Sequence, residues 1–226
     1  MSESAKLLME FLYFAILAAA FAYGAVKLFR KGVPLYFQLY VMLCGCRMLE
    51  RLISFAVLLC GLNSQYISAA SFFGMFSAAL FALSANRGTL DSIVDDKRNP
   101  ANKKARFFAL ITPTVIAAMV IIIVVINLRN GSIFNGIALV IAASPCVPAS
   151  YYNTKHLLLK DELGLLKATK SINIIVLIVY FIGFINNYLA VLLSDSIALY
   201  LIRVIVFSLP ALAVLASVKG AKKWKA

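Results

Sequence analysis

Charged residues and histidine are scarce in this sequence, and their scarcity excludes several classes of protein. Of 226 residues, 14% are charged and one is histidine, His156. An average soluble domain carries about 25% charged residues. A single histidine leaves neither a histidine-rich metal site nor a Ser-His-Asp triad to assign. Because no long polar stretch is left for a separate soluble domain, we expect residues 1–226 to form a single domain.

Cysteine is also rare, and its spacing matches neither a zinc motif nor a disulfide framework. The four cysteines lie in or at the ends of apolar stretches: Cys44, Cys46, Cys60 and Cys146. We interpret them as small buried hydrophobic residues. The sequence therefore predicts no metal, no cofactor and no set of catalytic residues, which favours a protein that is not an enzyme.

Apolar residues make up 63% of the chain and fall into long runs separated by short polar connections. A run of about 20 apolar residues is long enough to cross a bilayer as a helix. We predict an all-α integral membrane protein, a bundle of seven transmembrane helices surrounded by lipid. The predicted spans are Leu7–Phe29, Leu35–Leu62, Tyr66–Ala85, Phe107–Leu128, Ile133–Tyr152, Ile172–Leu193 and Ile197–Val218.

The distribution of lysine and arginine predicts the orientation of these spans. Together with Lys27 at the end of the first span, the first, third and fifth connections and the C-terminal tail hold 17 of the 22 basic residues, whereas the N-terminus and the other connections hold 2. Cytoplasmic loops are the basic ones, so the pattern predicts an outside N-terminus and a cytoplasmic C-terminus in a multi-pass protein of the cell membrane. Because this bias accounts for the net charge of +13, we do not expect nucleic-acid binding. The first apolar run lacks a strongly basic leader, and we expect it to be retained as a helix.

Seven polar residues inside the predicted spans, where burial is costly, are candidates for a site. They are Glu10, Arg47, Glu50, Arg51, Asn186, Asn187 and Arg203. Counted at about 1.5 Å per residue from the span ends, they gather between the midplane and the outer surface. We therefore predict an outward-facing, net-positive pocket that binds a small anionic group such as a carboxylate or phosphate, which arginine suits through its planar fork of donors.

Two other interpretations of these residues are open. The charges can form an internal ion-pair network that joins helices and binds nothing. Alternatively, Glu10 and Arg203 can extend towards the membrane surface. The pocket interpretation leads to a sensor-like or transporter-like protein. The alternative is a structural or regulatory membrane subunit that docks a partner on its basic cytoplasmic face.

The longest connection, Asn86–Arg106, is the expected site for a cytoplasmic protein partner. Its polar composition predicts the most mobile part of the chain. Asp91 and Asp95 share one helical face, as magnesium-binding carboxylates do in membrane transferases, but basic residues follow them and no second acidic motif exists. We interpret them as a solvated charged segment. We likewise expect Asn153–Ser171, which contains His156, to be a polar connection.

Small residues and prolines predict how the helices pack. Ala20 and Gly24 lie one turn apart, and Ala70, Gly74 and Ala78 recur every four residues; both strips allow another helix to approach closely. Pro145 and Pro148 should kink or break the fifth span, either as a static bend or as a hinge.

Overall fold

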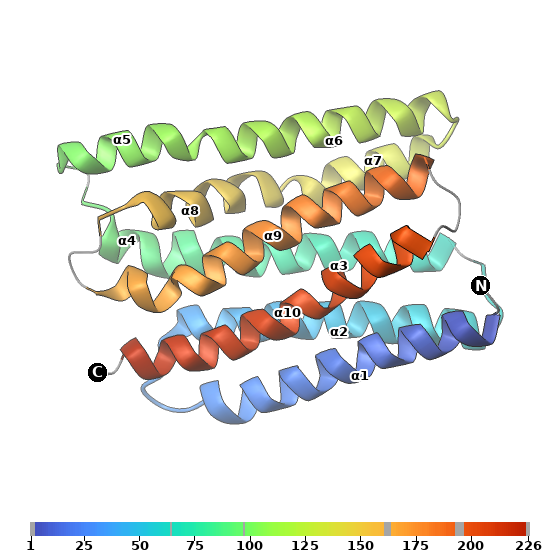
Figure 1. The fold of residues 1–226 in the computed structure, drawn as a ribbon, viewed down its shortest axis with the longest axis horizontal. Helices are drawn as coiled ribbons and strands as arrows, with labels where there is room; N and C mark the ends of the chain where they lie inside the picture. The colour runs from blue at the N-terminus through green and yellow to red at the C-terminus, as the bar shows by residue number, and fades with distance from the viewer. Residues whose placement is uncertain (1–2, 64, 97, 161–163, 193–196, 225–226) are drawn as a thin grey trace.

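The structure, a computed structural model, describes residues 3–63, 65–96, 98–160, 164–192 and 197–224, and every regular element in these ranges is a helix (Figure 1). The elements are α1 (Glu3–Leu28), α2 (Leu35–Leu59), α3 (Gln65–Leu83), the π-helix η1 (Ser84–Leu90), α4 (Asp91–Val94), α5 (Pro100–Ala109), α6 (Ile111–Arg129), α7 (Ile133–Ala143), α8 (Cys146–Leu158), α9 (Leu165–Leu192) and α10 (Ile197–Trp224).

Six helical stretches in the described ranges are long and apolar enough to cross a membrane. They are Ser4–Leu28, Gln65–Val94, Asn102–Arg129, Ile133–Leu158, Leu165–Asn186 and Ile202–Trp224. The prediction of an all-helical chain with several such spans is confirmed. The second predicted span corresponds to α2, which is 25 residues long but is not among the six; Arg47, Glu50 and Arg51 lie near its middle.

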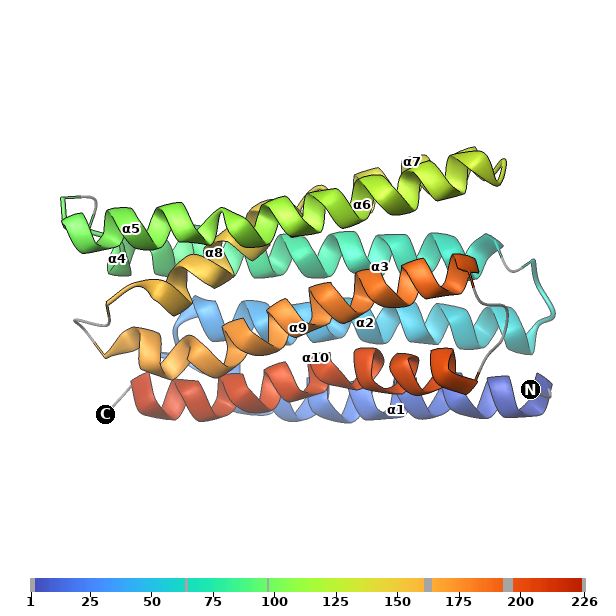
Figure 2. The same cartoon turned by 45° about the horizontal axis from the view of Figure 1, so that its top comes forward.

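The long helices run side by side, with the two chain termini at opposite ends of the bundle (Figures 1 and 2). We call the end that carries α4, α5 and Trp224 the C-terminal end, and the other the N-terminal end. Large apolar side chains are exposed along the flanks, among them Ile121, Ile137 and Leu215. Apolar flanks of this extent are compatible with a multi-pass membrane protein, whose surroundings are lipid tails.

Glycines determine where the helices approach most closely. In α1, a Cβ at Gly24 would lie 2.5 Å from a methyl of Val214 in α10 and 3.0 Å from a methyl of Val41 in α2. Gly74 of α3 lies directly against the Glu50 side chain of α2. Both predicted strips of small residues therefore face helix–helix contacts, as expected.

The fifth predicted span is broken, as its prolines indicated. α7 ends at Ala143 and α8 begins at Cys146, with Pro145 preceding α8 and Pro148 in its first turn. Proline is well tolerated in a first turn because the N–H it lacks has no helical partner there. α8 then continues to Leu158, beyond the predicted end at Tyr152.

The two expected polar connections differ from the prediction. The Asn86–Arg106 segment is largely helical, formed by η1, α4 and α5, and Asn86 is fully buried. In the other connection, residues 153–158 belong to α8, and Gly164, with φ +71°, precedes α9. Hydropathy alone did not predict these helical segments. Their polar side chains pair with one another, so the helices continue although the residues are not apolar.

Candidate functional site

Two glutamates and two arginines form a buried network on α1 and α2, towards the N-terminal end. Arg51 Nη1 donates to the carboxylate oxygens of Glu10 at 3.1 and 3.3 Å, and its Nη2 pairs with Glu50. Arg47, one turn earlier, pairs with the second oxygen of Glu50. Glu50 and Arg51 are only 1% and 3% exposed, so neutralisation depends on these partners.

Helices α3 and α10 complete the surroundings of this network. Ser71 donates a hydrogen bond of 3.2 Å to Glu50 Oε1. A Cβ at Gly74 would overlap the Glu50 carboxylate, so the close approach of α3 requires glycine at this position. From α10, the Phe207 ring lies under Arg51, with 3.9 Å between the guanidinium carbon and the ring centroid, a cation–π arrangement.

A cavity of about 290 Å³ lies beside the network. Its lining includes residues of α9 from Val176 to Asn186 and residues of α10 from Arg203 to Ala213. Its lining is mostly apolar. The charged and amide groups in the lining are Glu10, Arg47, Arg51, Asn186 and Arg203. Five of the seven sequence-predicted residues therefore share one cavity, with three arginines and one glutamate among them.

The remaining two predicted residues are placed differently. Glu50 is absent from the cavity lining, but its carboxylate pairs with Arg47 and Arg51, which do line the cavity. The side chain of Asn187 lies outside the described residues. The expected internal ion-pair network and the expected cavity thus occur together: the arginines that pair with Glu50 also line the space.

Three polar atoms of lining residues are buried without a hydrogen-bond partner among the described residues. They are Arg51 Nε and, from α9, the Tyr180 hydroxyl and the Asn186 amide oxygen. A buried polar group without a partner costs roughly 1–3 kcal/mol, so such groups commonly mark a place where a ligand or ordered water binds. Sequence reasoning overlooked Tyr180. The available signal was its spacing, because Tyr180, Gly183 and Asn186 recur every three residues and all line the cavity.

A second buried polar network joins α2, η1 and α8 towards the C-terminal end. The Asn86 side-chain nitrogen lies 2.7 Å from the Tyr40 hydroxyl, 3.0 Å from the Ala82 carbonyl oxygen and 2.8 Å from Asn153 Oδ1. Its oxygen lies 2.8 Å from His156 Nδ1. Tyr40, Asn86 and Asn153 are all fully buried, so this polar cluster is part of the core.

Charged side chains continue the second network to the surface. His156 Nε2 lies 3.1 Å from Asp91 Oδ1, and Lys155 pairs with Asp91 and, at 3.1 Å, with Asp95. Arg106 of α5 holds Asp95 through two bonds of 3.0 Å. Our expectation of solvated aspartates and of a histidine in a polar connection was wrong, because these oppositely charged groups meet across α4, α5 and α8.

Asp95 lies outside the long apolar stretches, and its environment favours the charged form. Burial by itself raises the pKa of this carboxyl, but the hydrogen bonds and charges of Arg106 and Lys155 outweigh burial, so the pKa lies below its usual value. Among the described residues, no three histidine, cysteine or acidic side chains are grouped so that they could hold a metal ion.

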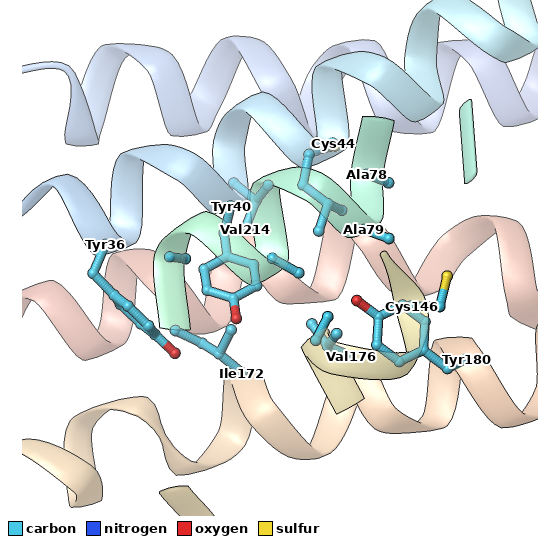
Figure 3. Packing of buried hydrophobic residues seen from close by; sticks show 14 of the residues in the cluster. Tyr36, Tyr40, Cys44, Ala78, Ala79, Cys146, Ile172, Val176, Tyr180 and Val214 are labelled. Carbon is cyan, nitrogen blue, oxygen red and sulfur yellow. The ribbon is translucent and has the colours of Figure 1, made fainter. Parts of the chain in front are cut away.

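Aromatic residues of α2 form a buried layer at the second network, to which Tyr40 itself belongs. Tyr36, Phe37 and Tyr40 of α2 are at most 1% exposed. Figure 3 shows Tyr40 and Tyr180 on either side of Val176, and both Val176 and Tyr180 line the cavity.

Comparison with known proteins identifies no relative: no family model, no curated protein and no solved structure matches this chain.

Proposed function

We propose that this protein is a non-enzymatic membrane protein that binds a small anionic amphiphile in the cavity, as a sensor or a transporter does. The observation that carries this proposal is the convergence of Arg47, Arg51 and Arg203 on one mostly apolar cavity. Its volume of about 290 Å³ is close to the lower end of the roughly 300–1,000 Å³ that is usual for small-molecule sites.

The charges of the lining support an anionic head group. Arg51 is shared between Glu10 and Glu50, Arg47 pairs with Glu50, and Arg203 adds a third guanidinium group to the lining. A carboxylate or phosphate would accept hydrogen bonds from these guanidinium groups. The apolar lining would receive a hydrocarbon portion, and the Tyr180 hydroxyl and Asn186 amide would contact polar atoms.

We also propose how the chain crosses the membrane. α2 would be the seventh span of a single-domain bundle in the cell membrane, with its three central charges neutralised by Glu10 and by one another. The N-terminus would lie outside, so that the cavity faces outwards and the basic C-terminal end faces the cytoplasm. A reporter fused after Ala226 should then be active in the cytoplasm, and one inserted at Asn63 outside.

A second candidate function is a structural or regulatory subunit that docks a protein partner at the C-terminal end. The supporting observation is on α5, where Lys103 and Lys104 are exposed beside Phe107 and Phe108, which are 70% and 53% exposed. Such a surface, which spans the end of the Asn86–Arg106 segment and the two residues after it, would suit an acidic, partly apolar partner, or alternatively the head groups of the bilayer.

The pocket is tested by direct binding of probes that differ only in head group. Octanoate and octyl phosphate are compared with octanol and octylamine in titration calorimetry on the purified protein in nanodiscs. The two anions should bind, whereas the neutral and cationic probes should not. Arg203→Gln should weaken octanoate binding about 10- to 100-fold. This factor corresponds to the loss of one charge-assisted hydrogen bond, which contributes roughly 1.5–3 kcal/mol.

Steric blocking gives a control that leaves every charge in place. A Cβ at Gly183 would meet no atom within 4 Å, so Gly183→Leu should fill the cavity without disturbing the fold. Gly88, in η1, has equally open surroundings and serves as the matched control. Loss of octanoate binding in Gly183→Leu but not in Gly88→Leu is the expected result. Equal binding of all four probes, or full binding by Gly183→Leu, would overturn the pocket.

A further inference from the structure

The orientation of two buried amides determines where the proton lies on the single histidine. Asn153 donates through its side-chain nitrogen to the Ala149 carbonyl at 2.9 Å, so its oxygen faces Asn86. The side-chain nitrogen of Asn86 lies between this oxygen and the Ala82 carbonyl, both of which are acceptors. Reversing the Asn86 amide would place oxygen against oxygen, and its oxygen therefore faces His156.

His156 Nδ1 must donate in this arrangement. It lies 2.8 Å from Asn86 Oδ1, an acceptor, so Nδ1 carries a hydrogen. In a neutral imidazole Nε2 would then be an acceptor, yet it lies 3.1 Å from Asp91 Oδ1, another acceptor. Two acceptors at this distance repel each other unless one proton lies between them. The contact as it stands requires that proton, on either Nε2 or the carboxylate.

We propose that His156 and Asp91 form a proton-binding site, in which one bound proton holds α4 against α8 and its release opens the C-terminal end of the bundle. The proton would enter from water at the Asp91 side chain, which is 21% exposed, whereas the His156 side chain is fully buried. On release, Nε2 and Oδ1 would face each other as two acceptors, and Asp91 would keep only its pairing with Lys155.

The groups around the site set its charge balance. Asp91 approaches from α4, and Asp95 lies just beyond it; Lys155 of α8 pairs with both carboxylates. Arg106 of α5 faces Asp95, and Tyr152 of α8 has its ring 6.3 Å from the imidazole. With the proton bound, the site holds three positive charges against the two carboxylates of Asp91 and Asp95. Without the proton, the two cations Lys155 and Arg106 balance the two carboxylates. Release is therefore compatible with local neutrality.

The π-helix gives the site a connection to the rest of the bundle. η1 carries Asn86 inwards to both His156 and Tyr40 of α2, and π-helical turns are frequent at functional sites. Tyr40 belongs to the same buried core cluster as Val176 and Tyr180, which line the cavity. If the cavity binds a transported anion, the proton is its coupling ion. That use of the proton rests on the proposed function, whereas proton binding itself does not.

The single histidine allows a direct test on the whole protein. Selective ¹⁵N labelling of histidine gives an NMR spectrum of His156 alone, recorded in nanodiscs between about pH 5 and pH 9, around the usual histidine pKa of about 6.5. We expect Nδ1 to stay protonated throughout while Nε2 loses its proton within the range. A neutral form protonated on Nε2, or an Nε2 that does not titrate, would overturn the proposal without using any variant.

Substitution separates proton binding from simple burial. Asp91→Asn places an amide where it can donate to Nε2, so the contact no longer needs a proton and proton binding by His156 should weaken at least about tenfold. Asp96→Asn is the matched control, because Asp96 is exposed and its carboxylate contacts the Arg98 backbone. Unchanged titration in Asp91→Asn would contradict the site.

Hydrogen exchange tests the opening. After correction for the intrinsic pH dependence, amides of residues 84–95 should lose protection in the wild type as His156 deprotonates, and should stay protected in Asp91→Asn. Constant protection in the wild type would contradict the opening. These measurements do not involve the cavity, so their failure leaves octanoate binding untouched, and failure of octanoate binding leaves them valid.

Discussion

The two buried polar networks of this bundle contain similar groups but differ in what surrounds them. At the C-terminal end, Asn86 uses both atoms of its amide and is enclosed by other side chains. At the N-terminal end, the arginines line a cavity, and two polar atoms that α9 contributes to its lining residues lack partners among the described residues. Charge inside a bundle is therefore a poor guide to a ligand site by itself. Space and unused hydrogen-bonding capacity distinguish one network from the other.

The largest expected effect concerns Arg51. Replacing it with alanine leaves Glu50 without one of its partners and Glu10 without its bidentate partner. Removing one member of a buried ion pair costs about 3–5 kcal/mol, so Arg51→Ala should lower the free energy of unfolding by that amount. Lys103→Ala, on the exposed surface of α5, should change it by less than about 0.5 kcal/mol. Denaturant unfolding in detergent measures both, and equal losses would contradict the comparison.

A double change separates the network from the pocket. Glu50→Gln with Arg51→Met removes one charge of each sign, and much of the lost stability should return because less charge is left unpaired. Octanoate binding should nevertheless stay weak, since an arginine of the cavity is gone. Recovery of both stability and binding would identify the N-terminal network as purely structural.

Lys155 should matter less than Arg51, although it is also buried. In Lys155→Met, Asp91 keeps its contact with His156 and a partly exposed side chain, and Asp95 keeps Arg106. We expect a loss of about 1–3 kcal/mol in the free energy of unfolding, the usual range for a weakened buried polar contact. A loss as large as that of Arg51→Ala would show that the C-terminal network has less redundancy than its contacts indicate.

The smallest effect is a pH dependence that belongs to Asp95. Its pKa is lowered in the folded protein, so its contribution to stability is complete above the unfolded value of about 3.9 and is lost as the pH falls through the lower, folded value. The difference in melting temperature between wild type and Asp95→Asn should therefore be constant near neutral pH and shrink below about pH 4. A difference in melting temperature that grows on acidification would mean that the pKa of Asp95 is raised, not lowered, in the folded protein.

Sequence patterns alone were sufficient for the helical class, for six of the apolar stretches and for naming five polar residues that line one cavity, whereas ligand binding by them stays a prediction. Apolar runs and their lengths are local properties, and polar residues at similar distances from span ends lie at similar depth. The break at Pro145 and the strip around Gly74 followed from backbone chemistry in the same way. Each of these features depends on residues close together in the chain.

Only the tertiary structure decided which polar residues meet. Asn86 and His156 are 70 residues apart, and Asp91 and Lys155 are 64 apart, so no local pattern could show that they neutralise and satisfy one another. Considered one at a time in the sequence, such polar residues indicate a solvated loop. The free-energy cost of burying each one is evident from its type, whereas the partner that offsets this cost is not. The Tyr180 hydroxyl, which has no partner among the described residues, was missed for the converse reason: the absence of a partner is a property of the packed neighbours, not of the residue.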